Sequence, residues 1–363
     1  MGTDSVIYIR TDGNREISTG HLVRCLSLAH SLQRRKKRVC FLVSDAESKG
    51  LLEEFLSSTE ADTGNLDIIT ISNTGYLNLQ QDYPFLLPLL HQSFNPTLIL
   101  DSYYVTPEYL EKVGEAAKLV YIDDLKKFDY DVDIVLNYDL ISPSEQREYR
   151  CFYSRAKHHL LGPAYTPLRP QFSEGKPSFR NRVENILITS GGSDPTGFCL
   201  RLARTLGNFS ETINLHVVVG KLFSEAEKAA LKELSQTSAA LFLHEGLTDL
   251  APLMKQCDLA VSAAGTTLYE LCALGIPAIS FTMADNQLTC ARAFAQQKVI
   301  PYAGDVRGFK EELSTICQRI TSFLQKMTGD PDRRKAAGEA VQRLIDGKGC
   351  ERIADAICSL WNE

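Results

Sequence analysis

Short apolar stretches alternate with amphipathic stretches along the chain, from Val6 onwards. An apolar run of strand length followed by a segment with helical periodicity is typical of a β–α unit, and successive units build a parallel sheet. Two consecutive series of such units predict an α/β protein with two doubly wound, Rossmann-like domains. Ligands of these domains bind at the carboxyl ends of the strands, so we look for a site in the turns that follow them.

The first series predicts strands at residues 6–10, 39–43, 67–71, 97–100, 119–122 and 134–136, and the second at 185–189, 215–219, 240–243, 259–262 and 278–281. Predicted helices include residues 21–33, 107–117, 197–206, 224–235, 248–256, 266–274, 286–297, 330–344 and 351–360. Residues 162–182 contain four prolines, as expected of a linker. We therefore predict a first domain over residues 1–165 and a second over residues 166–363, whose last helix can pack back on the first domain.

Composition excludes several classes of function. The net charge is −6, whereas a general nucleic-acid binder carries a basic surplus. The ten cysteines form no CxxC pair, which favours buried free thiols over disulfides or a zinc site. The sequence shows neither a signal-peptide pattern nor a run of 18 apolar residues, so we expect a cytoplasmic protein without membrane insertion. It does not determine the oligomeric state, for which a monomer is the default.

The first turn with chemical character, residues 11–25, reads TDGNREISTGHLVRC. Gly20 lets the backbone approach a ligand closely, and His21 follows in the first turn of the predicted helix. The positive end of a helix favours a neutral imidazole, which can accept a proton from water. A capping turn with an exposed histidine explains the same spacing, and the residues alone leave both readings open.

The second turn, SGGSDPTG at residues 190–197, contains Gly191, Gly192 and Ser193 ahead of a predicted helix. Backbone N–H groups there can receive a phosphate or shape the wall of a cleft. The pattern matches neither GxGxxG nor the GxxxxGK[ST] phosphate loop. A tight turn closed by an Asp or Thr cap is an equally good interpretation.

The third turn begins with SAAGTTLYE, residues 262–270. Ser262 precedes a helix start at which Gly265, Thr266 and Thr267 offer N–H and hydroxyl donors to an anion. Glu270 lies one turn further on, where a carboxylate can accept hydrogen bonds from two ribose hydroxyls. The alternative is a capped helix whose dipole Glu270 compensates.

Other polar residues follow predicted strands, where the cleft is expected. Asn286 and Gln287 open a helix beside the third turn, and their amides suit sugar hydroxyls or serve as ordinary caps. Carboxylates or amides also end three strands of the first series, at Asp101, Asp123-Asp124 and Asn137. The paired carboxylates have no His or carboxylate partner at metal-ligand spacing, so we predict no metal.

Together these stretches resemble a known family. SAAGTTLYEL…GIP followed by DNQ is similar to the UDP-binding half of GT-B glycosyltransferases, such as the GlcNAc transferase of peptidoglycan lipid synthesis. IRTDGNREISTGHLVRCLSLA, with ILDSYY, YIDD, VLNYDL, LLGPAYTPLRPQF and LITSGGSDPTG, resembles the UDP-2,4-diacetamido-2,4,6-trideoxy-β-L-altropyranose hydrolases of pseudaminic acid biosynthesis. The resemblance runs from about Val6 to Tyr302.

The resemblance implies a GT-B-like fold, with the two domains facing a central cleft, and a reaction that needs no cofactor. The family's Gly-x-Gly-His turn carries its catalytic histidine, which corresponds to His21, while its first glycine is Ser18 here. The first domain would then be catalytic and the second would hold UDP. His21 would activate a water that attacks C1 of the sugar with inversion and expels UDP, and Asp12 would contact the sugar or orient the water.

The residues that we expect to bind the UDP-sugar are Arg10, Gly20, Tyr104, Asn137, Gly191, Gly192, Ser193, Ser262, Gly265, Thr266, Thr267, Glu270, Asn286 and Gln287. Two other functions fit the same UDP site. One is a GT-B glycosyltransferase that passes a UDP-amino sugar to a sugar or lipid acceptor. The other is a non-catalytic protein that binds a UDP-sugar.

Overall fold

The computed structural model describes residues 5–14, 17, 19–57, 65–71, 75–173, 178–207, 209, 212–308 and 311–361. The chain divides into two compact units, which we name the N-terminal unit (Met1–Pro170 with Lys348–Glu363) and the C-terminal unit (Gln171–Gly347). This division places the boundary after Pro170, five residues beyond the predicted one (170 against 165), and assigns the last helix to the N-terminal unit.

The sheet of the N-terminal unit has, among the described residues, seven parallel strands in the order β3-β2-β1-β4-β5-β6-β7. Their bounds are β1 Val6–Thr11, β2 Arg38–Val43, β3 Leu66–Thr70, β4 Thr97–Asp101, β5 Lys118–Ile122, β6 Ile134–Asn137 and β7 His158–Leu161. The strand order reverses between β1 and β4, and doubly wound domains bind ligands at the carboxyl ends of strands beside such a reversal.

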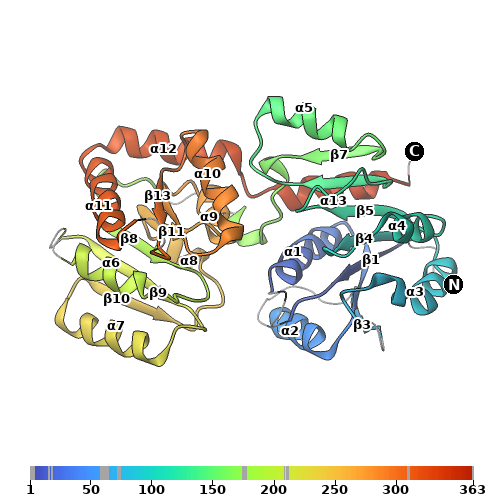
Figure 1. Ribbon diagram of the computed structural model, residues 1–363, viewed down its shortest axis with the longest axis horizontal. Helices are drawn as coiled ribbons and strands as arrows, with labels where there is room; N and C mark the ends of the chain where they lie inside the picture. The colour runs from blue at the N-terminus through green and yellow to red at the C-terminus, as the bar shows by residue number, and fades with distance from the viewer. Residues whose placement is uncertain are drawn as a thin grey trace. The chain divides into compact units, whose positions relative to one another are not determined.

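Helices cover both faces of this sheet (Figure 1). One face packs against α1 (Gly20–Arg34), α2 (Ala46–Ser57) and α13 (Gly349–Ser359). The other packs against α3 (Tyr83–Gln92), α4 (Pro107–Gly114) and α5 (Pro143–Phe152). Successive side chains of a strand point to opposite faces. Ile7 and Ile9 therefore join the α1 core, and Tyr8 joins the α3 core.

The sheet of the C-terminal unit has, in the described part of the chain, six parallel strands in the order β10-β9-β8-β11-β12-β13. The strands are β8 Asn185–Thr189, β9 Asn214–Val219, β10 Leu241–Glu245, β11 Leu259–Ala263, β12 Ala278–Thr282 and β13 Tyr302–Asp305. The helices are α6 Phe198–Leu206, α7 Glu225–Thr237, α8 Ala251–Met254, α9 Thr266–Ala273, α10 Leu288–Gln296, α11 Leu313–Gly329 and α12 Pro331–Leu344. The order reverses between β8 and β11.

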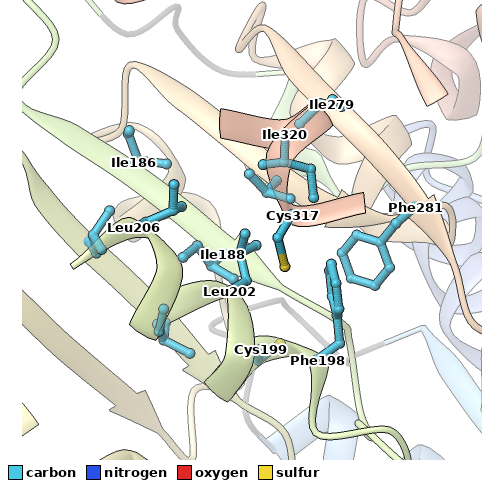
Figure 2. Close-up of a cluster of buried hydrophobic side chains, with 14 of the residues drawn as sticks. Ile186, Ile188, Phe198, Cys199, Leu202, Leu206, Ile279, Phe281, Cys317 and Ile320 are labelled. Carbon is cyan, nitrogen blue, oxygen red and sulfur yellow. The ribbon is translucent and has the colours of Figure 1, made fainter. Parts of the chain in front are cut away.

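The core on one face of this second sheet is built by α6 and α11 (Figure 2). Phe198 and Phe281 are in contact, with ring centroids 4.8 Å apart, and both are fully buried. Burying a phenylalanine side chain contributes about 1.5–3 kcal/mol, so this apolar layer holds β8 and β12 in place. The same two strands flank β11, which leads into the third turn.

Four elements differ from the sequence-based expectation. Strands β7 and β13 and helix α11 were not predicted, and the helix predicted at residues 248–256 is reduced to α8. Pro252 permits a helix only in its first turn, so the helix starts at Ala251, whose N–H donates to Asp249 Oδ1. Among the described helices, none combines the length and apolar character needed to cross a membrane.

A histidine pair on β9 and β10 should make the protein less stable in mild acid. His216 Nδ1 lies 2.9 Å from His244 Nε2, and His216 Nε2 lies 2.9 Å from Asn185 Oδ1. Burial lowers the pKa of both histidines below the ordinary 6.5, and His244 lowers the pKa of His216 further. The unfolded chain therefore binds protons more readily, so the stabilisation that the neutral pair provides above about pH 6.5 is lost as the pH falls.

Urea unfolding between about pH 7.5 and 5.5 measures this effect. The free energy of unfolding should fall with pH in the native protein and fall less in the His216→Gln/His244→Gln variant. Equal slopes in the two proteins would contradict the assignment.

Candidate active site

His21 and Asp101 meet at the carboxyl ends of β1 and β4. His21 is the second residue of α1, and Asp101 is the last residue of β4. The Nδ1 atom of His21 lies 2.6 Å from Asp101 Oδ1, and both side chains are buried. The N-cap residue of α1, Thr19, makes no side-chain cap, and the first turn of the helix has no acidic residue. Its N-terminal dipole therefore acts on the imidazole without a local counter-charge from α1.

Arg24, one turn after His21, holds Asp101 from the other side. Its Nε and Nη2 atoms donate to Asp101 Oδ2 and Oδ1 at 2.7 and 2.5 Å. Burial alone would raise the pKa of Asp101, but the Arg24 charge and the Arg24 and His21 hydrogen bonds outweigh it and hold that pKa well below its usual range. Asp101 is therefore an anion across the working pH range of the protein.

An ionised Asp101 fixes the proton of a neutral His21. A carboxylate only accepts hydrogen bonds, so at 2.6 Å the shared proton belongs on Nδ1. The lone pair then lies on Nε2, to which no described residue donates or accepts a hydrogen bond. An imidazole oriented in this way by a buried carboxylate is suited to take a proton from water.

His21 opens onto a small recess within the N-terminal unit. The recess is lined by Asp12, Ile17, His21, Tyr76, Asp101, Ser102, Tyr103 and Tyr104. Tyr103 packs edge-on against the imidazole, with ring centroids 4.7 Å apart. Burial and the charge of Asp124 raise the pKa of Tyr103 to about 12, so its hydroxyl stays protonated. Aromatic walls beside carboxylates suit a sugar that has both apolar and polar edges.

Asp12 lies on the recess, whereas Arg10 lies behind it. Asp12 Oδ1 accepts from the Ser44 N–H at 2.6 Å, and its Oδ2 accepts from Arg10 Nη1 at 2.5 Å. Arg10 is fully buried, and its Nε donates to Asp82 Oδ2 at 2.6 Å. Burial alone would lower the pKa of Arg10, but the charges of Asp12 and Asp82 outweigh it and raise that pKa. Arg10 therefore holds Asp12 in position and does not reach the recess.

Two further residues that were predicted in this unit take different positions. Gly20 is exposed at the start of α1, and a Cβ atom there would meet nothing within 4 Å. Asn137 is buried, and its amide is satisfied there: Nδ2 donates to the Asp123 carbonyl, and Oδ1 accepts from the Asp139 N–H. Asn137 is thus occupied in shaping the strand ends. Ser18, which stands where the family pattern has a glycine, lies outside the described residues.

In the C-terminal unit, α9 begins at the predicted third turn. Its N-cap residue, Gly265, makes no side-chain cap, and its first turn has no acidic residue. Thr266 is exposed and Thr267 half-buried, so their N–H and hydroxyl groups can reach an anion. Glu270 is buried one turn on, and Ser262 is buried with its hydroxyl on the Ala263 carbonyl. The start of α9 therefore suits a phosphate, and Glu270 suits a polar group of the same ligand next to that phosphate.

The turn at residues 190–197 is closed by its own aspartate. Asp194 accepts from the Phe198 and Cys199 N–H groups at 3.0 and 2.7 Å and so caps α6. Gly191 has φ +87°, and a Cβ on Gly220 would lie 2.4 Å from the Gly192 carbonyl oxygen. These glycines permit a close backbone crossing. Ser193 is half-buried beside them. The capping interpretation describes this turn, because Asp194 already occupies the N–H groups of the helix start.

The Asp-Asn-Gln turn at residues 285–287 lies between β12 and α10. Asn286 is exposed, whereas the Gln287 Oε1 accepts from the Met283 N–H at 2.9 Å and closes the turn. Arg307 Nη2 contacts Asp285 Oδ1 at 2.9 Å and ties the turn to the end of β13. Asn286 is therefore the member of this turn whose side chain can reach a ligand.

Sequence reasoning missed the roles of Arg24 and Asp124. Arg24 also donates to Asp124 from Nη1 and Nη2 at 2.9 and 2.8 Å. The signal for Arg24 was its spacing, since residues three apart on a helix share a face and His21 and Arg24 must point the same way. Among the described residues, no group of three or more His, Cys, Asp or Glu side chains could hold a metal ion.

Sequence comparison finds relatives along the chain, although no family model matches it. The chain is 28% identical to an uncharacterized protein of Methanocaldococcus jannaschii over 295 residues, which is 78% of the chain and 57% of the relative. It is 23% identical to the spore coat polysaccharide biosynthesis protein SpsG of Bacillus subtilis over 98% of the chain and 99% of that protein.

A third relative is named for the activity that the motifs indicated. The chain is 26% identical over 259 residues to a Helicobacter pylori protein named pseudaminic acid cytidylyltransferase and UDP-2,4-diacetamido-2,4,6-trideoxy-β-L-altropyranose hydrolase. The match covers 70% of the chain and 45% of that protein, so the chain spans about half the length of this relative and of the archaeal one. The resemblance that we inferred from the motifs is confirmed.

Solved structures show which fold the chain has. MurG of Acinetobacter baumannii matches with a TM-score of 0.66 at 14% identity, over 98% of the chain and all of that structure. A UDP-glucosyltransferase of Polygonum tinctorium matches with a TM-score of 0.66 at 13% identity, over all of both chains. The chain has the GT-B fold. The prediction of an α/β protein with two Rossmann-like domains is confirmed.

Proposed function

We propose that the protein hydrolyses a UDP-linked diacetamido-trideoxy hexose at C1, releasing UDP and the free sugar for pseudaminic acid or a related nonulosonate. The observation that carries the proposal is the hydrogen bond between His21 Nδ1 and the ionised Asp101, which leaves Nε2 as a base at the recess. The name of the Helicobacter pylori relative supports this choice of substrate.

In the proposed reaction, Nε2 of His21 takes a proton from water as the oxygen attacks C1. The C1–O bond to UDP breaks, and the electron pair leaves with the β-phosphate. Attack opposite the leaving group inverts the anomeric centre. The uncapped start of α9, at Gly265 and Thr266, stabilises the charge that develops on the diphosphate, and Glu270 accepts the ribose hydroxyls. Asp12 orients the water or contacts the sugar.

Release of UDP without an acceptor tests the function. The protein should free UDP from a UDP-diacetamido-trideoxy hexose in buffer alone, as measured by an assay coupled to UDP. Turnover only after addition of a sugar or lipid acceptor would instead identify a glycosyltransferase. UDP binding without turnover across a panel of UDP-amino sugars would identify a binding protein.

Gly265→Val should weaken UDP binding without weakening the fold. The backbone at Gly265 is extended, and a Cβ there would meet nothing within 4 Å, so valine fits the free protein. The added methyl groups would stand where a phosphate meets the helix N–H groups, so we expect the Kd for UDP, measured by calorimetry, to rise at least about tenfold. Gly50→Ala on α2, also without a neighbour within 4 Å, is the control. Unchanged UDP affinity in Gly265→Val would remove α9 from the UDP site.

A further inference from the structure

A row of charged groups leads away from His21 within the N-terminal unit. The imidazole contacts Asp101, Asp101 contacts Arg24, and Arg24 contacts Asp124, whose side chain is 25% exposed. Arg24 Nη2 also lies 3.0 Å from His21 Nδ1. Within this row of described groups, the Arg24 guanidinium is therefore the positive charge nearest to the imidazole. Asp124 is the second carboxylate that Arg24 contacts, after Asp101.

The signs of these charges decide how easily His21 takes a proton. An imidazolium is favoured by Asp101 and disfavoured by Arg24, because one charge is opposite and the other alike. The Arg24–Asp101 pair is neutral as a whole and gives the imidazolium little net support. With Asp124 included, the three groups sum to one negative charge, which matches the positive charge that His21 gains as a base.

The other groups facing His21 leave this balance in place. Cys25, on the same helix, donates its thiol to Asp101 Oδ2 at 3.2 Å and is neutral, since burial raises its pKa well above the usual value. Tyr103 is also neutral. Asp12 shares the recess, but its charge is paired with the buried Arg10. Among the described residues, Asp124 forms an ion pair only with Arg24. The same guanidinium also holds Asp101.

We propose that Asp124 is a positioning residue that acts through Arg24 and makes His21 a stronger base. It holds the guanidinium on Asp101 with two hydrogen bonds and cancels the charge that would otherwise weaken the base. The importance of this role for catalysis rests on the proposed function, whereas the role itself is a property of the free protein.

NMR titration of the His21 imidazole in the free protein tests the inference. The His21 Cε1–H resonance is identified among the seven histidines by its absence in His21→Asn. Asp124→Asn should lower the titration midpoint by about 0.5–1 pH unit, because the Arg24 charge is no longer offset. Asp124→Glu should restore most of the shift. Arg24→Gln should move the midpoint upward, and this reversal of sign is not expected from a merely structural role.

Two variants separate charge from packing. Tyr138→Phe removes a neutral hydroxyl that accepts a hydrogen bond from Arg24, and it should leave the midpoint within about 0.2 unit of wild type. Asp131→Asn removes an exposed carboxylate paired with Arg155 and should not move it either. An unmoved midpoint in Asp124→Asn, or an equal shift in Tyr138→Phe, overturns the inference. The titration needs no substrate, so a protein that fails to hydrolyse UDP-sugars but shows these shifts contradicts only the proposed function.

Discussion

Replacement of His21 by asparagine is expected to lower kcat for UDP release by about 10³-fold, the usual contribution of a positioned general base. Asparagine suits this test, because its amide nitrogen can take the place of Nδ1 and keep a hydrogen bond to Asp101. The variant retains that contact and loses only the lone pair of Nε2. UDP affinity should change by less than about twofold, since the proposed UDP-binding residues are not touched.

The control for this variant is His91→Asn, which changes an exposed histidine near the end of α3. Its kcat should equal that of the native protein. If His21→Asn retained the native kcat while folding normally by circular dichroism, His21 would not be the base, and the hydrolytic mechanism derived from it would fail.

Asp101→Asn should be nearly as damaging and should also destabilise the protein. Oδ1 of Asp101 accepts hydrogen bonds from His21 and Arg24, and Oδ2 accepts one from Arg24, so both oxygens face donors. An asparagine amide must turn its NH₂ toward one of them. If it faces His21, it forces the proton onto Nε2 and removes the base, and if it faces Arg24, donor meets donor. We expect kcat to fall by about 10³–10⁴-fold, as when a carboxylate that fixes the tautomer of a catalytic histidine is lost.

The stability cost of Asp101→Asn arises from Arg24, which loses one of its two anionic partners. Breaking a buried ion pair by removing one partner costs about 3–5 kcal/mol, and we expect the lower part of that range because Asp124 still pairs with Arg24. Urea unfolding measures the free-energy change. The kcat values are compared without urea, at a temperature at which both proteins are folded. Asp131→Asn serves as the matched control. Native activity in Asp101→Asn would show that Asp101 does not orient the base.

The fold could be predicted from the sequence because its strands are long apolar runs. VIYIR of β1 and NILIT of β8 carry an unambiguous signal, and the repeated β–α order then fixes a parallel sheet. Strand β7 reads HHLL and β13 reads YAGD, with Gly304 at φ +141°. Such short strands are specified by pairing with β6 and β12, which is a long-range property that local pattern does not contain.

The sequence predicted only those parts of the candidate site that depend on a single strand-to-helix turn. His21 and the start of α9 were found because a helix beginning after an apolar strand is visible in the sequence. The contact between His21 and Asp101 spans 80 residues and depends on β4 lying beside β1. Arg10 was expected at the ligand for its place near the strand end. Alternation puts its side chain on the α3 face with Tyr8, where Asp82 binds it.

The central claim, that an activated water attacks C1, is tested most directly by hydrolysis in water enriched with ¹⁸O. The products of a single turnover are separated, and their masses are measured by mass spectrometry. The account predicts ¹⁸O in the hydroxyl group at C1 of the released sugar and none in UDP. Label in the β-phosphate of UDP, with an unlabelled sugar, would show attack at phosphorus and contradict the account.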